Sequence, residues 1–204
     1  MSGAERIVHV VDDDASVRTA LTRLLQAAGH AVSAWDSARA FLQAGAGMAR
    51  GCVVLDLRMA EMDGLELQQA LAQQNPGLPI IFLTGHGDLA TGVRAMKAGA
   101  ADFLTKPVER QTLLAAVVDA LARDQANQAA QEELRSLRQC FATLTARERE
   151  VFERVAAGLL NKQIAMEIGA AERTVKLHRA RVMEKMQAGS LADLVRAADR
   201  LKLH

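Results

Sequence analysis

Acidic, hydroxyl and basic residues directly follow four short apolar runs of this sequence. Asp12 and Asp13 follow IVHVV, Asp56 follows CVVL, Thr84 follows IIFL, and Lys106 follows DFLT. Three carboxylates that are brought together repel one another unless a hard divalent cation and a cationic side chain neutralise them. A Mg²⁺ site with a hydroxyl and a lysine beside one aspartate is suited to taking up a phosphoryl group. The residue types therefore indicate phosphoryl chemistry.

The apolar runs before these residues have the length and β-branched content of strands, and turn residues flank them. Helix-length amphipathic segments separate them, as in a parallel sheet built from βαβ units. Open α/β sheets place chemistry outside the carboxyl ends of their strands, so the four sets of residues should converge on one crevice. We expect an α/β, doubly wound, five-stranded parallel sheet with strand order 2-1-3-4-5.

The elements of this sheet can be placed along the chain. Gly29, Gly77 and Gly99 stand where helices should end. Strands are expected near 6–12, 31–35, 51–56, 79–84 and 101–104, and helices near 15–28, 37–44, 63–74, 88–98 and from 109 onward.

The strand pattern disappears in the last third of the chain, and four short helices replace it. Thr145 and Glu148 have the spacing of a capping box that opens a helix. Asn161 and Ser190 are candidate N-caps for two later helices. The four helices are expected to run to about 157, from 161 to about 168, from about 172 to 187, and from 190 onward. Such helices make a small all-α domain.

The helix expected at 172–187 has two different faces. Val175, Val182 and Met186 fall together and should pack on the domain core. The opposite face carries three cations and a small residue, which suit insertion into the major groove of DNA, although a solvated charged face is the alternative. That face comprises Arg173, Lys176, Leu177, Ala180, Arg181 and Glu184.

A connector lies between the two parts. Residues 124–140 contain neither glycine nor proline, and their composition favours a helix. We expect a semi-rigid helical linker, with an ordinary solvated helix as the alternative. The predicted domains are 1–123, the linker 124–140, and 141–204.

Bulk composition restricts the classes of protein. Half of the 204 residues are apolar, which argues against disorder. We expect a cytoplasmic protein, because there is neither a signal-peptide pattern nor an apolar run that could span a bilayer. Cys52 and Cys140 are expected to be free thiols. Residues 1–124 contain 11 basic and 14 acidic residues, whereas residues 125–204 contain 14 and 10, so the second part suits nucleic acid.

These features together resemble a known family. The first 124 or so residues resemble a response-regulator receiver domain, closest to that of FixJ and its relatives, and the last 60 or so resemble a LuxR-type helix-turn-helix. The tandem is similar to the NarL/FixJ family of two-component transcription regulators. The carrying motifs are Asp12-Asp13, Leu55 to Met59, Thr84 to Gly87, Met96 to Ala100, Lys106-Pro107, Leu144 to Val151, Asn161 to Ala165 and Thr174 to Arg179.

The resemblance implies roles in the first domain. Asp56 would be the phosphorylation site and act with Thr84 and Lys106 as the catalytic set. Thr84 and Phe103 would form the conformational switch, although an ordinary core aromatic is the alternative for Phe103. The Mg²⁺ ligands would be Asp12, Asp13, Asp56 and the Arg58 carbonyl, Asp14 would be a surface acid or helix cap, and the Lys106-Pro107 bond would be cis. Ala60 departs from the family, which usually has proline there.

The resemblance also implies contacts in the second domain. Lys176, Leu177 and Ala180 would lie nearest the bases, and Ala171 departs from the serine cap that relatives often have. The full set of implied DNA-binding residues is Lys162, Arg173, Thr174, Lys176, Leu177, Arg179, Ala180 and Arg181. Val195, Ala198 and Leu201 would pair two copies on DNA, with a purely structural stripe as the alternative.

The expected function is that of a phosphorylation-activated, DNA-binding transcription regulator. A sensor histidine kinase would phosphorylate Asp56, and the homodimer would bind promoter DNA and engage RNA polymerase. The protein would not be an enzyme beyond its own Mg²⁺-dependent phosphorylation and dephosphorylation. One alternative is DNA binding that ignores phosphorylation. The other is a haloacid-dehalogenase-type phosphatase, which Asp12-x-Asp14 formally allows but which needs an acidic pair after Lys106 that is absent.

Overall fold

The computed structural model describes residues 6–85 and 89–202. Residues 86–88, including the predicted helix start at 88, lie outside the described residues. The chain divides into two compact units, Met1–Gln128 and Ala129–His204, and the boundary falls inside one long helix, α5. The predicted linker 124–140 lies within that helix, and its boundaries stay a prediction. Each unit is described by itself.

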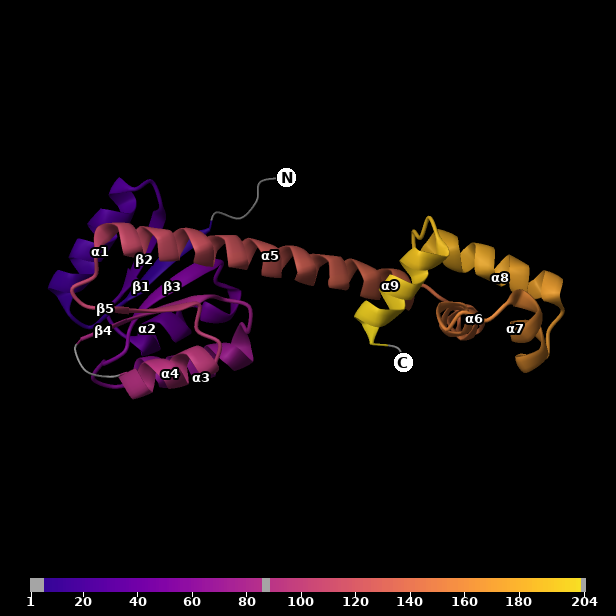
Figure 1. Cartoon of the computed structure of the whole chain (residues 1–204), viewed down its shortest axis with the longest axis horizontal. Coiled ribbons are helices and arrows are strands. Elements are labelled where there is room, and N and C mark those ends of the chain that lie inside the picture. The colour runs from indigo at the N-terminus through magenta and orange to yellow at the C-terminus, as the bar shows by residue number, and fades with distance from the viewer. Residues whose placement is uncertain (1–5, 86–88, 203–204) are drawn as a thin grey trace. The chain divides into compact units, whose positions relative to one another are not determined.

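The first unit is a parallel sheet between two layers of helices (Figure 1). The strands have the order β2-β1-β3-β4-β5, and every pairing is parallel, so the predicted topology is confirmed. The strands are β1 (Ile7–Val11), β2 (Ala31–Trp35), β3 (Gly51–Asp56), β4 (Ile80–Thr84) and β5 (Asp102–Thr105). The helices are α1 (Ala15–Ala27), α2 (Ala38–Gln43), the 3-10 turn η1 (Ala46–Met48), α3 (Gly64–Gln74), α4 (Leu89–Lys97) and α5 (Arg110–Ala142).

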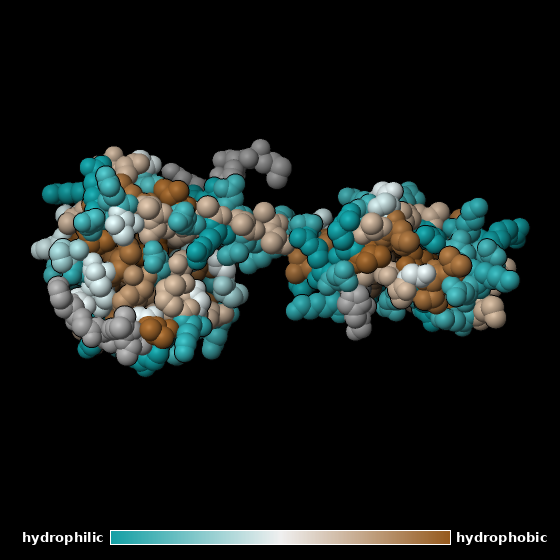
Figure 2. Space-filling view, in the orientation of Figure 1, coloured by the Kyte–Doolittle hydropathy of each residue, from teal (hydrophilic) through white to brown (hydrophobic). Residues whose placement is uncertain are grey.

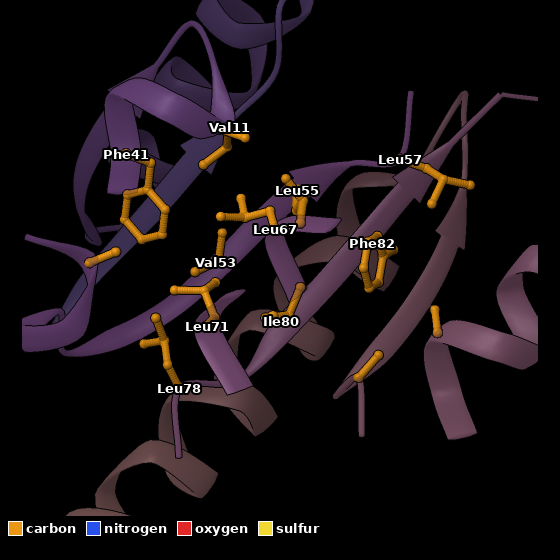
Figure 3. Packing of buried hydrophobic residues seen from close by; sticks show 14 residues of the cluster. Val11, Phe41, Val53, Leu55, Leu57, Leu67, Leu71, Leu78, Ile80 and Phe82 are labelled. Atoms are coloured by element: carbon orange, nitrogen blue, oxygen red, sulfur yellow. The ribbon is translucent and has the colours of Figure 1, made fainter. Parts of the chain in front are cut away.

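Burial on both faces explains why the strands are almost continuously apolar. Every residue of β3 and β4 is buried, as expected for a parallel sheet covered by helices. On one face Leu25 of α1 and Leu113 of α5 pack on the sheet. On the other, Phe41 of α2 and Leu67 of α3 do so, and Figure 3 shows these side chains gathering beside β3. The sheet is therefore a rigid platform for the residues at its edge.

The strand register brings the carboxyl ends to one edge. Val11 of β1 pairs with Leu55 of β3, so Asp12 emerges next to Asp56. Thr84 ends β4 and pairs with Thr105, the residue before Lys106. The four sequence positions that could do chemistry therefore emerge at the same edge, as predicted. The Lys106-Pro107 bond is cis, which was also predicted.

Gly51 is required at the start of β3. Its φ of +111° lies in the region that glycine favours, and an added Cβ would lie 2.0 Å from the carbonyl oxygen of Ile7. Cys52, the next residue, is a buried free thiol, and burial raises its pKa to about 12. It is therefore a packing residue of the strand and not a reactive one.

The middle of α5 is anchored to the first unit by polar contacts. Asp124 is fully buried, its Oδ2 lies 3.7 Å from Nε of Arg6, and its Oδ1 accepts a hydrogen bond of 3.4 Å from Gln128. Asn127 Nδ2 donates to the Gly77 carbonyl at 2.8 Å. These contacts hold α5 against the rest of the first unit as far as residue 128, the last residue of that unit.

The second unit contains the end of α5 and four further helices around one core. The helices are α6 (Ala146–Ala156), α7 (Asn161–Glu167), α8 (Glu172–Lys185) and α9 (Leu191–Leu201). Val151, Phe152, Ile164, Val182 and Leu194 form the centre of the core, with 1% exposure or less. The predicted four-helix domain is confirmed. Within the described part of the chain, no helix has the length and apolarity needed to cross a membrane.

The caps of these helices agree with the sequence analysis at two places and differ at a third. Thr145 and Glu148 form the predicted capping box, and Ser190 caps α9. Asn161 is not the N-cap of α7, because the helix begins one residue earlier with Leu160 at that position. The Asn161 side chain instead accepts a hydrogen bond of 3.2 Å from Arg179 of α8, a tertiary contact that competes with capping.

Candidate functional site

Three carboxylates gather at the carboxyl edge of the sheet in the first unit. Asp12 and Asp13 follow β1, and Asp56 ends β3. Asp12 and Asp56 are buried, with 1% and 7% exposure, whereas Asp13 is exposed. One ligand oxygen of each lies within 4.8 Å of the others. Such a set of hard oxygen donors fits Mg²⁺, which binds few carboxylates and keeps several waters.

Lys106 links two of these carboxylates. Its Nζ lies 2.8 Å from Oδ2 of Asp12 and 2.6 Å from Oδ1 of Asp56. Both distances are those of charge-assisted hydrogen bonds. Because three negative charges face one positive charge, the cluster keeps a formal charge of −2. A divalent cation would balance that charge.

The shared lysine and the burial of the site shift two pKa values. Burial and the neighbouring Asp12 charge raise the pKa of Asp56 above its ordinary value, although hydrogen bonding to Lys106 opposes the rise. Burial would lower the pKa of Lys106, but hydrogen bonds to Asp12 and Asp56 outweigh it and raise that pKa. Lys106 therefore stays protonated at neutral pH, ready to face an anionic group.

The carboxylates open into a cavity of about 440 Å³, which is large enough for a phosphoryl group. Thr84 lines it from the end of β4 and is 2% exposed, and its hydroxyl donates to the Gly85 carbonyl at 3.1 Å. The Arg58 backbone N–H donates to Oδ2 of Asp56 at 3.2 Å. The full lining is Asp12, Asp13, Asp14, Val17, Asp56, Arg58, Thr84, Gly85 and Lys106.

Asp14 differs from its acidic neighbours in its role. Its side chain accepts from the backbone N–H groups of Ser16 and Val17, at 2.7 and 3.2 Å, and caps α1. These hydrogen bonds lower the pKa of Asp14. The prediction of a helix cap is confirmed.

Phe103 lies on β5 beside the site and packs on two elements. Its ring is half-buried, and its centroid lies 6.4 Å from that of Phe82 on β4. Gly92 of α4 faces the same ring, since a Cβ added there would lie 2.8 Å from Cε1 of Phe103. The role of Gly92 was not predicted, because no local sequence pattern connects a helical glycine to an aromatic residue on the following strand.

Ala60 makes a contact with the site that was not predicted either. Its backbone N–H donates to Oδ2 of Asp13 at 3.2 Å, across 47 residues of sequence. The available signal was the absence of proline at this position, because proline has no N–H to donate.

In the second unit, α8 separates its residues as the helical wheel predicts. Val175 and Val182 are fully buried, and Met186 is 4% exposed. Figure 2 shows hydrophilic side chains at the end of this unit where α7 and the start of α8 lie, and hydrophobic ones nearer its middle. The exposed residues of α8 include the predicted face, namely Arg173, Lys176, Leu177, Ala180, Arg181 and Glu184, together with Thr174.

Two predicted DNA-binding residues lie outside that face in different settings. Lys162 on α7 is exposed. Arg179 is partly buried and donates to Asn161, so it links α7 to α8. Ala171 occupies the N-cap of α8 without a side-chain hydrogen bond, as the missing serine predicts.

The stripe predicted to pair two copies on DNA mostly faces the domain's own core. Ala198 is 1% exposed, and Leu201 packs against the same core cluster. Ala198 exposes little surface to a partner in this structure, and pairing of two copies through the stripe stays a prediction. Val195 is partly buried. The hydrophobic periodicity of α9 does not distinguish a stripe that packs on the domain's own core from a stripe that forms a dimer interface, because both have the same spacing.

Comparison with known proteins covers both units. Residues 8–118 match the response regulator receiver domain family, and residues 142–198 match the luxR family of bacterial regulatory proteins. The chain belongs to the response regulators. This response regulator carries a receiver domain and a LuxR-type DNA-binding domain, and the resemblance to the NarL/FixJ family is confirmed.

Several relatives match nearly the whole response regulator. Nodulation protein W of Bradyrhizobium diazoefficiens is 48% identical over 200 residues, covering 98% of this chain and 88% of that protein. The transcriptional regulatory protein FixJ of Azorhizobium caulinodans is 48% identical over 192 residues, covering 94% and 90%. The solved structure of the response regulator StyR has a TM-score of 0.84 and 47% identity, covering 97% of this chain and all of that one. The domain pair and these relatives make it a two-component transcription regulator.

Proposed function

We propose that this response regulator is activated by phosphorylation of Asp56 and then binds promoter DNA as a dimer. The observation that carries the proposal is the Asp56 carboxylate at the end of β3, hydrogen-bonded to Lys106 and joined by two further carboxylates within 4.8 Å. The phosphoryl group would come from a phosphohistidine of a sensor kinase. The P–N bond breaks as an Asp56 oxygen forms the new O–P bond, and the leaving histidine nitrogen takes up a proton.

The residues around Asp56 have separate roles in this transfer. Asp12, Asp13, Asp56 and the Arg58 carbonyl would hold Mg²⁺, which supplies charge neutralisation for the transferring group. Lys106 is placed to stabilise a phosphoryl oxygen, because its ammonium already contacts Asp56. In our proposal the protein catalyses only this transfer and the later hydrolysis of its own aspartyl phosphate, in which water takes up the phosphoryl group, the O–P bond to Asp56 breaks and inorganic phosphate leaves; it turns over no other substrate.

Activation would pass from the phosphoryl group to the surface through Thr84 and Phe103. The Thr84 hydroxyl donates to a neighbouring carbonyl and can turn toward a new anionic acceptor. Phe103 would then leave its place beside Gly92 and turn inward, which repacks the face of α4, β5 and α5. That face would form the dimer, and α8 of each copy would enter the major groove. We infer a cytoplasmic protein whose dimer works on promoters together with RNA polymerase.

The first test is intact mass after incubation with Mg²⁺ and acetyl phosphate. Wild type should gain a single phosphoryl adduct that survives acid and is lost in base. Asp56→Asn should gain none, whereas Asp14→Asn should behave as wild type because asparagine caps a helix as well as aspartate. An adduct on Asp56→Asn, or none on wild type with an active donor, would overturn the assignment.

The second test separates phosphorylation-dependent DNA binding from its rival. DNA fragments selected from a random pool with phosphorylated wild type provide the ligand. We expect phosphorylated protein to bind them more tightly than unphosphorylated protein, and Asp56→Asn to bind only as the unphosphorylated form does. If Asp56→Asn binds as tightly as phosphorylated wild type, the receiver is a scaffold and DNA binding is independent of phosphorylation.

A further inference from the structure

We propose that the backbone N–H of Ala60 is a positioning group for Asp13, holding this carboxylate ready for the divalent cation. The inference rests on the proposed function, since it requires that the three carboxylates bind Mg²⁺. It assigns a role to a residue at which this chain departs from the usual proline of its family.

The other two carboxylates are each held by two hydrogen bonds. Asp12 accepts from Lys106 at 2.8 Å and from the Asp14 backbone N–H at 2.9 Å. Asp56 accepts from Lys106 at 2.6 Å and from the Arg58 N–H. Both side chains are buried, so their orientations are determined before a cation arrives.

Asp13 lacks that support. It is exposed, and Lys106 pairs with its two neighbours. Among the residues that the structure describes, the hydrogen bond recorded for its carboxylate comes from the Ala60 N–H, at 3.2 Å to Oδ2. Ala60 belongs to the loop after β3, so this bond also joins that loop to the one after β1.

One amide suffices to orient the ligand without blocking it. A carboxylate has two oxygens and about four lone pairs, so Oδ1 of Asp13 stays available to a cation. Groups that hydrogen-bond metal ligands set their orientation, and losing one typically weakens metal affinity 10- to 100-fold. The N–H matters here, and the methyl group of Ala60 does not.

Proline at this position removes the donor, and its Cδ takes the place of the amide hydrogen that points at Oδ2 of Asp13. The Asp13 carboxylate must then turn away, and the cavity of about 290 Å³ that Ala60 and Asp13 both line gives it room to do so. Serine at the same position keeps the N–H and is the matched control. The pair Ala60→Pro and Ala60→Ser therefore separates the amide from the side chain.

The decisive experiment is calorimetric titration of the full chain with Mg²⁺, without any phosphodonor. We expect Ala60→Pro to bind Mg²⁺ about tenfold more weakly than wild type, and Ala60→Ser to match wild type. In an Asp13→Ala background, Ala60→Pro should change nothing further, because the acceptor is gone. Equal affinities of wild type and Ala60→Pro would overturn the inference alone. A wild type that does not bind Mg²⁺ would overturn the proposed function, and the inference with it.

A second readout needs neither metal nor the proline variant. Amide hydrogen exchange at Ala60 in metal-free protein should be slow in wild type and faster in Asp13→Ala. Exchange at the neighbouring Arg58 amide, which donates to Asp56, should stay unchanged and serves as the internal control. The same exchange rate at Ala60 in both proteins would show that Asp13 does not hold this amide.

Discussion

Asp13 shows how one residue can be placed for function at the expense of stability. Lys106 offsets only one of the two negative charges of Asp12 and Asp56, and Asp13 adds a further negative charge within 4.8 Å of both. Like charges at such distances destabilise one another. Without a bound cation the cluster therefore opposes folding, and the buried sheet beneath it must compensate.

The substitution Asp13→Asn should accordingly stabilise the metal-free receiver. We expect a gain of about 1 kcal/mol in the free energy of unfolding, because one like charge is removed while the side chain can still accept from Ala60. Urea denaturation without Mg²⁺ measures this gain, with Glu109→Gln, an exposed acid of the same unit, as control. Added Mg²⁺ should stabilise wild type more than the variant. An Asp13→Asn protein no more stable than wild type would refute this account of the cluster.

In the second unit, Glu148 holds α6 and α8 together through a buried carboxylate. It is 2% exposed, accepts from Lys185 Nζ at 2.6 Å, and accepts from the Thr145 N–H at 2.9 Å. The Lys185 hydrogen bond and then the Thr145 hydrogen bond lower its pKa from 4.5 to about 2. Its stabilisation is therefore fully present above pH 4.5 and is lost as the pH falls through about 2.

Glu148→Gln should destabilise the second unit by about 2 kcal/mol at pH 7, the usual size for a hydrogen bond to a charged group. The difference from wild type should shrink between pH 4.5 and 2, where the wild-type carboxylate takes up its proton. Thermal unfolding followed by circular dichroism measures both effects. Glu153→Gln, on an exposed position of the same helix, is the control. A difference that persists unchanged down to pH 2 would contradict the assigned cause.

At the scale of elements, α4 and β5 meet through Gly92 and Phe103. The Phe103 ring occupies the space that a side chain at position 92 would need, because a Cβ added to Gly92 would lie 2.8 Å from the ring. A buried hydrogen bond of 3.1 Å from Gln68 of α3 to the Ala95 carbonyl holds α4 from its other side. The position of the ring therefore depends on the absence of a side chain at one helical residue.

Gly92→Ala should displace the Phe103 ring and bias the proposed switch. Because the clash is with the far end of a side chain, the ring can move while the helix stays in place. We expect more dimer in unphosphorylated Gly92→Ala than in unphosphorylated wild type, measured by sedimentation velocity. The double variant Gly92→Ala/Phe103→Ala should return to the behaviour of Phe103→Ala alone. If Gly92→Ala stays as monomeric as wild type, the ring is a packing residue.

At the scale of the whole molecule, the chain combines an acidic unit with a basic one. The carboxylate cluster lies in the part with 11 basic and 14 acidic residues, and α8 lies in the part with 14 and 10. Lysine and arginine side chains that contact DNA phosphates make the DNA affinity depend on salt concentration. Side chains that hydrogen-bond to base edges determine sequence specificity, so replacing one of them relaxes the preference for a base.

Lys176→Gln should reduce DNA affinity by about 1–3 kcal/mol if this lysine reads a base edge, and relax the sequence preference at one position. Lys202→Gln, an exposed lysine of the same unit outside α8, should have little effect. Fluorescence anisotropy on the selected fragments at several salt concentrations distinguishes the roles. A uniform loss on all sequences with a shallower salt slope would assign Lys176 to a phosphate.

Much of this protein was determined locally and could be predicted from its sequence. Each described α-helix and strand begins within two residues of its expected position and also ends there, apart from α5 and α9, whose ends were left open; the 3-10 turn η1 was not predicted. Apolar period, capping boxes and turn glycines act over a few residues, so they are legible in the chain itself. The strand ends also predicted that Asp12, Asp56, Thr84 and Lys106 would emerge at one edge, because parallel strands leave little freedom there.

Tertiary structure decided the contacts between residues that are distant in sequence. Four such features are the burial of Ala198, the hydrogen bond from Arg179 to Asn161, the contact of Gly92 with the Phe103 ring and the hydrogen bond from Ala60 to Asp13. Each depends on how one element packs against another. A periodic stripe or a loop residue has the same sequence pattern whether it faces core, partner or solvent. Only the packing of one element on another distinguishes these cases, because it determines which groups are removed from water and which hydrogen-bond partner each polar atom has.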